Sequence, residues 1–475
     1  MVYFEVWLTL FELIRYFRIN DPYRLAGLLT LMLALYLPFF IDSPALTVPE
    51  LKSMVIGEKV RDGLSPYSEL IESTAPLTSW TYAFIDLIFG RSLLARHIIA
   101  FLIIFSQSLF LGIMFIDKKV FTENTFIPSV LFSVLFFFSF DTLALTGELM
   151  ASGFLLLALN SLFREIEFKV QRNETVFNLG LFISLASLCS FATSIYLLAS
   201  LGILAFYTRS TPRKYLLMIF GYILPHVFVM SLYYLSGNLE ALWSYYYIPN
   251  MDMPGAALVN LKTLLVLGAI PLFYLLVSIV ILNREARFSK YQSQLLQAMF
   301  LWLMTSFPQI AFSRDLRPQN LIVLIPCFAY FITHLLLLIR RRRFAEINFW
   351  VLTLSIVTVA YLSRYNKLGS VDYENLMVGK AAPVTNKKVL LLGKGIEVYR
   401  SNELGSGFLD WSLSEKIFRD PDYYDNVMVV YNSFKNDPPE IIIDHDNLMS
   451  GFLKRIPELN KAYVKTSEDT YTLKQ

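Results

Sequence analysis

Long apolar runs are the feature that most constrains this chain. A helix needs about 20 mainly apolar residues to cross the hydrocarbon core of a bilayer. Eight runs approach or reach that length: Leu25–Ile41, Leu93–Ile116, Phe126–Leu143, Leu216–Leu235, Leu264–Leu282, Leu295–Ala311, Leu321–Leu338 and Phe349–Leu362. The sequence therefore predicts an all-α polytopic membrane protein.

Two further runs complete the set of predicted spans. Glu148–Phe163 is slightly short and begins with an acid. Phe177–Phe206 is too long for one crossing, and we divide it near Ser190–Ser194, where Ser and Thr gather. The total is about eleven spanning helices. Composition agrees, since 17% of the 475 residues are charged, against roughly 25% in soluble domains.

The distribution of charge separates a second domain from the membrane domain. Residues 365–475 carry 14 basic and 16 acidic side chains, so about 27% of them are charged. The first 364 residues carry 27 basic and 22 acidic side chains, about 13%. We therefore expect a transmembrane domain at 25–364, with an outer loop at 42–92, followed by a soluble domain at 365–475.

The soluble domain has the pattern of a small α/β fold. Short apolar runs predict strands at Lys388–Leu392, Val427–Tyr431, Glu440–Ile443 and Thr470–Leu473. Helical spacing of apolar residues predicts helices at Leu413–Phe418 and Leu448–Ala462. No catalytic motif lies in this domain.

Basic residues predict the orientation of the spans. They gather in alternate connections, at 15–24, 118–119, 164–172, 209–214, 284–290 and 340–343. Such connections face the cytoplasm. With an odd number of spans, the N-terminus is cytoplasmic and the C-terminal domain is periplasmic, outside the inner membrane. Residues 1–24 mix charged with aromatic residues and predict an amphipathic helix on the cytoplasmic surface.

Composition and motifs exclude several classes of protein. A net charge of +3 is too small to indicate a nucleic-acid partner. The two cysteines, Cys189 and Cys327, lie in apolar runs and predict no disulfide. The sequence contains no phosphate-binding loop, dinucleotide-binding turn or zinc spacing. Asp444-His-Asp446 resembles a set of metal ligands, but three consecutive residues rarely converge on one ion, so no metal site is predicted.

The outer loop at 42–92 is unusually long for a connection between spans, and such loops are often functional. Thr47-Val-Pro-Glu50 has the spacing of a capping box, with Pro in the first turn. A helix should continue to about Asp62 and end at Gly63. Leu51, Met54, Val55 and Glu58 share one face of it, so we expect a short helix lying across the outer face of the bundle.

Motifs in this loop resemble a known family. Gly63-Leu-Ser-Pro-Tyr67, Thr74-Ala-Pro-Leu77 and Phe89-Gly90 resemble the first outer loop of integral-membrane glycosyltransferases of the C-type (GT-C) fold. The similarity is greatest to mannosyl- and aminoarabinose-transferases that use polyprenyl-phosphate sugars. In that family an acidic pair opens the loop. Here Pro49 replaces the first acid, so only Glu50 remains.

The resemblance continues later in the chain and implies roles for particular residues. Thr146-Gly-Glu148 looks like the family's second outer acidic site, and Arg314 with Arg317-Pro318 looks like its basic motif. A displacement at the sugar carbon needs a base for the acceptor proton and cations for the phosphate leaving group. Glu50 is the candidate base and Glu148 a second acid. Arg314 and Arg317 are the candidate phosphate ligands.

Two aromatic residues, Tyr67 and Trp80, are candidates for stacking on sugar faces. No cofactor is implied beyond the polyprenyl-phosphate sugar as donor substrate, and a requirement for a divalent metal is left open. Every assignment has a structural alternative. Glu50 and Glu148 can serve as helix caps, and Arg314 can pair with Asp315 at the surface. The aromatic run Trp243–Tyr247 also fits a membrane-interface belt.

Three functions compete. The first is an inner-membrane glycosyltransferase that moves a sugar from a polyprenyl phosphate to an envelope acceptor. The second is a GT-C-like membrane scaffold without catalysis, which the loss of an acid at Pro49 favours. The third is a transporter of a lipid-linked glycan, which the absence of repeated halves disfavours. The expected partners are membrane lipid, the lipid-linked sugar, and a protein or glycan acceptor at the C-terminal domain.

Overall fold

The computed structural model describes residues 13–167, 173–208, 211–252, 257–285, 288–365, 367–369, 371–379 and 385–474. The chain groups into two compact units. The first consists of Met1–Pro44, Leu94–Val227 and Ala256–Tyr373, and the second of Ala45–Leu93, Phe228–Gly255 and Glu374–Gln475. The second unit thus joins the predicted outer loop to the C-terminal segment, although most of the long helices lie between them in sequence.

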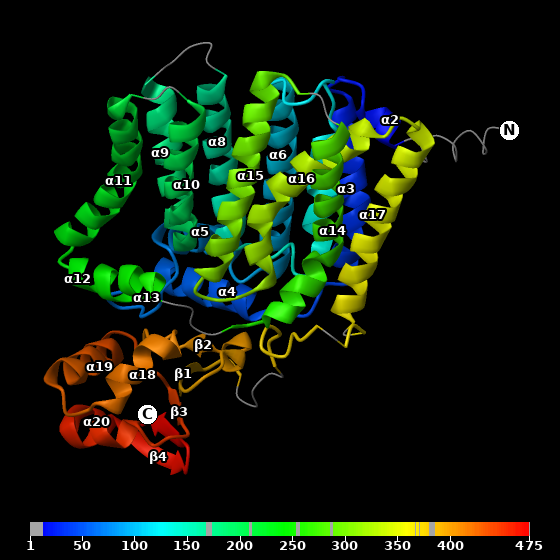
Figure 1. Cartoon of the computed structure of the whole chain (residues 1–475). Coiled ribbons are helices and arrows are strands. Elements are labelled where there is room, and N and C mark those ends of the chain that lie inside the picture. The colour runs from blue at the N-terminus through cyan, green and yellow to red at the C-terminus, as the bar shows by residue number, and fades with distance from the viewer. Residues whose placement is uncertain are drawn as a thin grey trace. The chain divides into compact units, whose positions relative to one another are not determined.

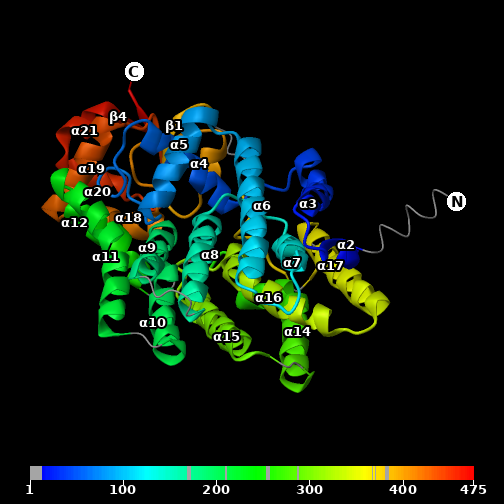
Figure 2. The same cartoon turned by 90° about the horizontal axis from the view of Figure 1, so that it is seen from above.

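The first unit is helical. Its elements are α2 (Leu13–Phe17), α3 (Arg24–Ile41), α6 (Leu93–Asp117), α7 (Ile127–Leu135), η1 (Phe136–Phe138), α8 (Gly147–Ile166), α9 (Asn173–Cys189), η2 (Phe191–Ser194), α10 (Ile195–Tyr207), α11 (Pro212–Leu235), α14 (Leu261–Glu285), α15 (Lys290–Ala311), η4 (Pro318–Leu324), α16 (Ile325–Leu338) and α17 (Arg342–Arg364). The last residues of α11 belong to the second unit. Figures 1 and 2 show the long helices standing roughly side by side.

Most of the predicted spans fall on these helices, but Phe126–Leu143 does not form one long helix, since α7 ends at Leu135 and η1 ends at Phe138. Seven helices in the described part of the chain are long and apolar enough to cross a membrane, and three shorter apolar helices accompany them. The run divided near Ser190–Ser194 is interrupted there, since α9 ends at Cys189 and η2 begins at Phe191. The chain is a multi-pass membrane protein of largely helical fold. Its total of eleven crossings stays a prediction.

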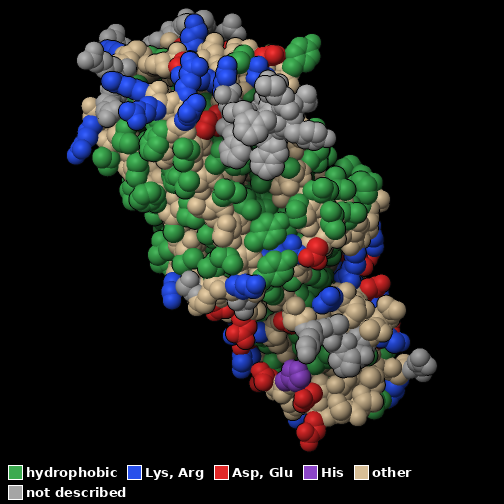
Figure 3. Space-filling view, turned by 90° about the vertical axis from the view of Figure 1, so that its right-hand side faces the viewer, with side chains coloured by type: hydrophobic (Ala, Val, Ile, Leu, Met, Phe, Trp, Pro, Cys, Tyr) green, Lys and Arg blue, Asp and Glu red, His purple; other side chains and the backbone are tan. Residues whose placement is uncertain are grey.

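Helix α17 has one buried apolar face and one exposed apolar face. Its inner face, which includes Phe349, Leu352 and Ile356, is buried. Phe344, Ile347, Val351 and Leu354 are each half or more exposed, and they recur at helical spacing. Figure 3 shows the helical unit from this side, with hydrophobic side chains over much of the face and Lys and Arg gathered toward one end. An exposed apolar stripe of this kind suits contact with lipid tails.

Helices α9 and α11 pack closely through two glycines. A Cβ on Gly180 would lie 2.0 Å from the carbonyl oxygen of Met218, and a Cβ on Gly221 would lie 2.3 Å from that of Phe177. No side chain fits at either position unless the backbones separate. Small residues that allow such an approach are typical of helix pairs in membranes.

The predicted amphipathic segment at 1–24 is described only from residue 13. Helix α2 forms within it, with Ile14 and Phe17 buried, and the carbonyl oxygen of Phe17 accepts a hydrogen bond from the backbone N–H of Phe126. Residues 1–12 lie outside the described part of the chain. The cytoplasmic location of the segment stays a prediction.

In the second unit, the outer loop contains α4 (Val48–Arg61) and α5 (Pro76–Phe89). The segment Phe228–Gly255 contributes α12 (Leu239–Leu242), η3 (Trp243–Tyr247) and α13 (Ile248–Met251). The predicted bounds of α4 are confirmed, and Gly63 follows it with a φ of +102°. The four residues predicted to share one face are all buried, and six further residues of α4 are buried with them, Lys59 among them.

The C-terminal segment forms a small α/β domain, as predicted. Its elements are β1 (Lys388–Leu392), η5 (Glu397–Arg400), β2 (Glu403–Leu404), α18 (Trp411–Arg419), α19 (Tyr424–Asn436), β3 (Ile441–Asp444), α20 (Met449–Arg455), α21 (Pro457–Ala462), β4 (Tyr463–Ser467) and β5 (Thr470–Leu473). The sheet has the order β2-β1-β3-β5-β4. Strands β2, β1 and β3 run parallel to one another. Strand β5 pairs antiparallel with β3, and β4 pairs antiparallel with β5.

One predicted strand is wrong, because Val427–Tyr431 lies inside α19. A short apolar run does not by itself distinguish a strand from a buried helix. Here Val430 and Phe434, four residues apart, are the buried positions. They face the hydrophobic core of the domain, which contains Phe418 and Phe452.

Candidate functional site

Glu50 lies at the start of α4, where it completes a capping box. Its Oε2 accepts hydrogen bonds from the backbone N–H of Thr47 at 2.9 Å and from the Thr47 hydroxyl at 2.8 Å. The Glu50 side chain is buried, with 7% exposure. The extended chain before α4 is also fixed, because the N–H of Val48 donates to the carbonyl oxygen of Leu376. The structural role of Glu50 is therefore established, and its role as a base stays a proposal.

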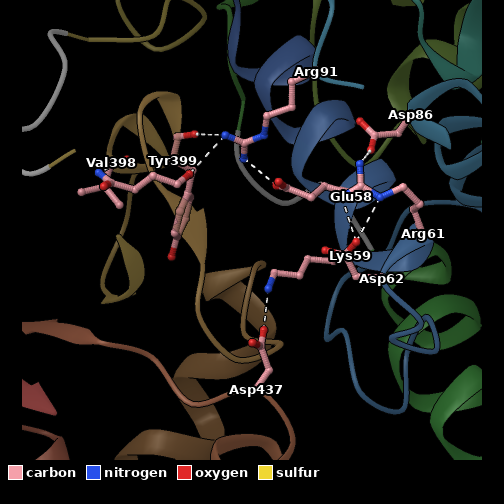
Figure 4. A network of polar contacts seen from close by, with 10 residues as sticks. Glu58, Lys59, Arg61, Asp62, Asp86, Arg91, Val398, Tyr399 and Asp437 are labelled. Atoms are coloured by element: carbon pink, nitrogen blue, oxygen red, sulfur yellow. Dashed lines mark hydrogen bonds and ion pairs between the residues drawn. The ribbon is translucent and has the colours of Figure 1, made fainter. Parts of the chain in front are cut away.

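The other end of α4 carries a network of charges, shown in Figure 4. Arg91 pairs with Glu58 at 2.9 Å, and its guanidinium also donates to the carbonyl oxygens of Tyr399 and Asn402, each at 3.2 Å. Burial raises the pKa of Glu58, and the attraction of Arg91 only partly offsets that effect. Arg91 thus ties the loop to the turn that follows η5.

Lys59 makes a second link between α4 and the C-terminal domain. Its ammonium lies 2.5 Å from Asp437 Oδ2, and both side chains are more than nine-tenths buried. Lys388 on β1 approaches Asp437 Oδ1 at 2.8 Å. Burial would raise the pKa of the Asp437 carboxyl, but hydrogen bonds from Lys388 and Lys59 outweigh it, so this pKa lies below its ordinary value.

The loop also joins the C-terminal domain through its backbone. Ile71 forms a parallel bridge with Phe408, and its N–H donates to the carbonyl oxygen of Gly407 at 2.7 Å. A Cβ on Gly407 would lie 1.5 Å from the carbonyl oxygen of Glu69. Only glycine permits this approach. Ile71 is itself part of the domain's hydrophobic core, so the loop completes that core.

Tyr67 and Trp80, the candidates for sugar stacking, occupy different environments. Tyr67 is fully buried, with its ring 5.6 Å from that of Tyr233 and 5.7 Å from that of Tyr246. Its hydroxyl donates to the carbonyl oxygen of Thr74 at 2.5 Å. Its φ of +71° is unusual for a residue with a side chain. Trp80 on α5 is half-buried. Access of a sugar to Tyr67 would require the surrounding rings to move.

Glu148 and Arg317 form the site in the first unit. They are 169 residues apart in sequence, yet Arg317 Nη2 lies 2.6 Å from Glu148 Oε1. Glu148 is in the first turn of α8, whose N-cap Thr146 accepts a hydrogen bond from the N–H of Leu149. Arg317 is the N-cap residue of η4. Glu148 is 4% exposed, and the structure therefore pairs a buried acid with one of the predicted phosphate ligands.

A second polar contact joins η4 to the segment before α8. Gln319 donates to Asp141 Oδ2 at 2.6 Å and to the Asp141 carbonyl oxygen at 3.0 Å. Ser139 donates to Asp141 Oδ1 at 2.5 Å. These bonds tie the non-helical segment before α8 to η4. Arg314, the other predicted phosphate ligand, is half-buried, and its role stays a proposal.

Sequence reasoning missed three of these acids. Asp141 and Asp437 carry no motif, and their importance depends on partners far away in the sequence. Glu72 is fully buried, and it accepts hydrogen bonds from the N–H of Thr74 and the hydroxyl of Ser79 at the start of α5. Burial raises the pKa of Glu72. One signal in the sequence could have indicated a structural role for Glu72. It lies next to Ser73 and Thr74, just before a helix that begins with Pro.

Glu50 belongs to the second compact unit and Glu148 to the first. Among the described residues, no group of three or more His, Cys, Asp or Glu is arranged to hold a metal ion. His445 of the Asp-His-Asp run pairs instead with Asp469, at 3.0 Å.

Comparisons with known proteins concern the fold. No protein-family model matches the chain, and no functionally described protein matches it in sequence. Among solved structures it is similar to ArnT from Cupriavidus metallidurans bound to undecaprenyl phosphate, with 12% identity and a TM-score of 0.47, over 67% of this chain and 61% of that one. It is also similar to the oligosaccharyltransferase AglB from Archaeoglobus fulgidus in complex with an inhibitory peptide and a dolichol-phosphate, with 9% identity and a TM-score of 0.47, over 95% of this chain and 74% of that one.

Both similar proteins are glycosyltransferases of the GT-C fold, the family that the outer-loop motifs resemble. The match spans less than two thirds of the length of ArnT. At 9–12% identity the similarity concerns the fold alone, and it assigns no role to any residue.

Proposed function

We propose that this protein is a membrane glycosyltransferase that moves a sugar from a polyprenyl phosphate to an acceptor of the cell envelope. The observation that carries the proposal is the ion pair between Arg317 and the buried Glu148. A guanidinium group presents five donors in a fork that matches phosphate oxygens. A carboxylate that holds this fork in place prepares it for the phosphate of a lipid donor.

The proposed reaction is a single inverting displacement. The acceptor hydroxyl or amine gives its proton to a carboxylate and attacks the anomeric carbon of the sugar. The bond from that carbon to the phosphate oxygen breaks, and the polyprenyl phosphate leaves with the electron pair. Arg317 and Arg314 stabilise the charge that develops on the phosphate.

Glu50 is the proposed base. Two hydrogen bonds from Thr47 hold the carboxylate in place. They use about half of the roughly four sites at which a carboxylate can accept a hydrogen bond or a proton. Glu148 is the alternative base, and its pairing with Arg317 suits a positioning role better. No cofactor is proposed, and dependence on a divalent metal is measured by assaying transfer with and without EDTA.

The direct test is transfer by the purified full-length protein. Undecaprenyl- and dolichyl-phosphate sugars with a radiolabelled sugar serve as donors, with envelope lipids and peptides as acceptors. We expect label to move from donor to acceptor. We also expect binding of the unlabelled lipid phosphate to weaken in the Arg314→Gln/Arg317→Gln variant. Absence of transfer from every donor, with lipid-phosphate binding unchanged in the variant, would reject the proposal.

The proposed location is the inner membrane, with the N-terminus in the cytoplasm and the C-terminal domain in the periplasm. The alternation of basic connections supports this orientation. A reporter active only outside the cytoplasm should be active when fused after residue 475 and silent when fused after Arg343. Activity after Arg343 would reverse the assignment.

A membrane scaffold without catalysis is the second candidate. One specific observation favours it: the single remaining acid of the loop motif, Glu50, already serves as a helix cap, while Pro49 occupies the first turn of α4. Under this alternative, cells that carry Glu50→Gln grow normally and cells that lack the protein do not.

A further inference from the structure

The C-terminal domain contains a hollow of about 440 Å³ at the carboxyl ends of two of its parallel strands. Its floor is apolar and comes from β1, β3 and the start of η5. Its polar rim consists of Gly393, Lys394, Glu397, His445 and Asp446. Volumes of roughly 300–1,000 Å³ are typical of sites for small molecules.

The topology of the sheet favours a binding site at this place. Strand β1 lies between β2 and β3, and all three run parallel. The chain leaves β1 for β2 on one side and later reaches β3 on the other side. The turns after β1 and β3 therefore diverge and leave a crevice between them. In open α/β sheets, ligands bind in the crevice at such a switch point.

Local hydrogen bonds fix the turn after β3. Asp444 is buried, and its two carboxylate oxygens accept from the N–H groups of Leu448 and Met449 at 2.9 and 2.8 Å. His445 Nδ1 lies 3.0 Å from Asp469 Oδ2. Asp446, the next residue, is exposed at the rim. The wall that carries Asp446 is therefore formed without a ligand.

The opposite wall is also fixed. The hydroxyl of the buried Tyr399 accepts a hydrogen bond from the N–H of Leu391 at 3.2 Å, which ties η5 to the end of β1. Gly395 has a φ of +111°, and a Cβ there would lie 2.5 Å from Glu397 Oε2. Glu397 therefore folds back over the glycine turn, and Lys394 stands exposed between Gly393 and Gly395.

The charges of the rim define the kind of ligand. The rim carries two carboxylates, Glu397 and Asp446, and one ammonium, Lys394, while His445 is already paired with an acid. The helix after β1, η5, has four residues, so it supplies little of the macrodipole that attracts phosphate at longer helices. An anionic ligand would meet net negative charge. Hydroxyl groups, by contrast, can donate to the carboxylates and accept from the ammonium.

We propose that this hollow binds a neutral, hydroxyl-rich ligand, namely one or two sugar units of a glycan. Asp446 on one wall, and Lys394 and Glu397 on the other, would hold the hydroxyl edge, and the apolar floor would receive the C–H face. The site lies within the C-terminal domain and requires no chemistry. It therefore goes beyond the proposed function, and it stands or falls independently of transferase activity.

The test uses the fluorescently labelled full-length protein in a detergent without a sugar headgroup, applied to an array of neutral and anionic glycans. We expect binding to a subset of the neutral glycans. For the strongest of these in free form, we expect the double change Lys394→Ala/Asp446→Ala to weaken binding at least about tenfold, because both walls lose their polar contacts. The change of two exposed side chains should leave the melting temperature near that of the parent.

The matched control is Glu415→Ala/Lys461→Ala, which removes the same types of charge from α18 and α21 outside the hollow. It should bind like the parent. Three results would overturn the proposal. These are binding to no neutral glycan, equal weakening by the control, and competition by inorganic phosphate that disappears in Lys394→Ala, which would indicate an anion site instead.

Discussion

Two buried glutamates near the starts of two helices lie in different environments in the two units. Glu50 and Glu148 both lie in the first turn of a helix, after a threonine N-cap, and both are less than a tenth exposed. Glu50 accepts hydrogen bonds from its own N-cap residue, whereas Glu148 meets Arg317 from another part of the chain. Their local positions already differ, because Glu50 is the third residue of its helix, the capping-box position, and Glu148 is the second. The partner of Glu148, Arg317, is a matter of tertiary structure.

The comparison assigns different consequences to the loss of each acid. A capping glutamate can be replaced by glutamine, because the amide oxygen accepts the same backbone hydrogen bond. A glutamate in a buried ion pair cannot, because the partner charge would remain without compensation. Substitutions at the two acids and at their partners test this difference.

The first prediction concerns the proposed base. Glu50→Gln should slow sugar transfer by about 10²–10⁴-fold, because glutamine cannot accept the acceptor proton. The melting temperature should change little, since the bond to the N–H of Thr47 persists. Initial rates with a radiolabelled donor and a thermal melt of the same sample measure both quantities. If transfer survives in Glu50→Gln and is lost in Glu148→Gln, the base lies in the first unit.

The second prediction concerns the ion pair of the first unit. Arg317→Gln should lower the stability of the folded protein by about 3–5 kcal/mol, because Glu148 would be a buried charge without its cation. The double variant Glu148→Gln/Arg317→Gln should recover most of that loss. Denaturation of the four proteins in a double-mutant cycle measures the coupling. Independent, additive losses would show that the pair has no energetic coupling.

The third prediction concerns the buried link of the second unit. Lys59→Met should lower the stability of the folded protein by about 1–3 kcal/mol. This loss is smaller than that expected when a buried acid loses its only cation, because Lys388 still neutralises Asp437. Lys388→Met is the matched control. Its side chain is 41% exposed, so its loss should be roughly 1 kcal/mol or less. Chemical denaturation gives both values, and a larger loss for Lys388→Met would reverse the assignment.

The fourth prediction concerns pH. The pKa of Glu58 is raised in the folded protein because the carboxyl is buried. The protonated form therefore favours folding, and that contribution is lost as pH rises from the ordinary glutamate pKa through the raised one. Relative to the parent, Glu58→Gln should gain stability over this interval and show no gain at lower pH. Melting temperatures of both proteins across a pH series provide the measurement, and a gap that is constant with pH would contradict it.

Much of the architecture was predictable because apolar periodicity reflects burial directly. The spans, the helix α4, the strand β1 and the small terminal domain all follow from patterns within 20 residues. The run at Val427–Tyr431 failed because five apolar residues suit both a strand and a buried helix. Its helical spacing becomes visible only when Phe434 is included.

The site was predictable only in part, since a motif names residues but not their partners. Glu148 and Arg317 were singled out separately, and their 2.6 Å contact depends on how α8 and η4 pack. Lys59 and Asp437 carried no motif, and 378 residues separate them. Contacts of this kind depend on the whole fold, which a single sequence does not display.

The joining of the outer loop to the C-terminal domain has a consequence for biosynthesis. Ser73 and Asp410, which lie within hydrogen-bond distance, are 337 residues apart in the sequence. The same separation divides Ile71 from Phe408, its partner in the parallel bridge. At about 5–20 residues per second, the ribosome needs roughly 20–70 s to supply the second half of that interface. During this interval the loop helix α4 exists without its partner strands, with Lys59 and Ile71 uncovered. The final packing of the loop therefore depends on residues that are translated only after all the helices of the first unit.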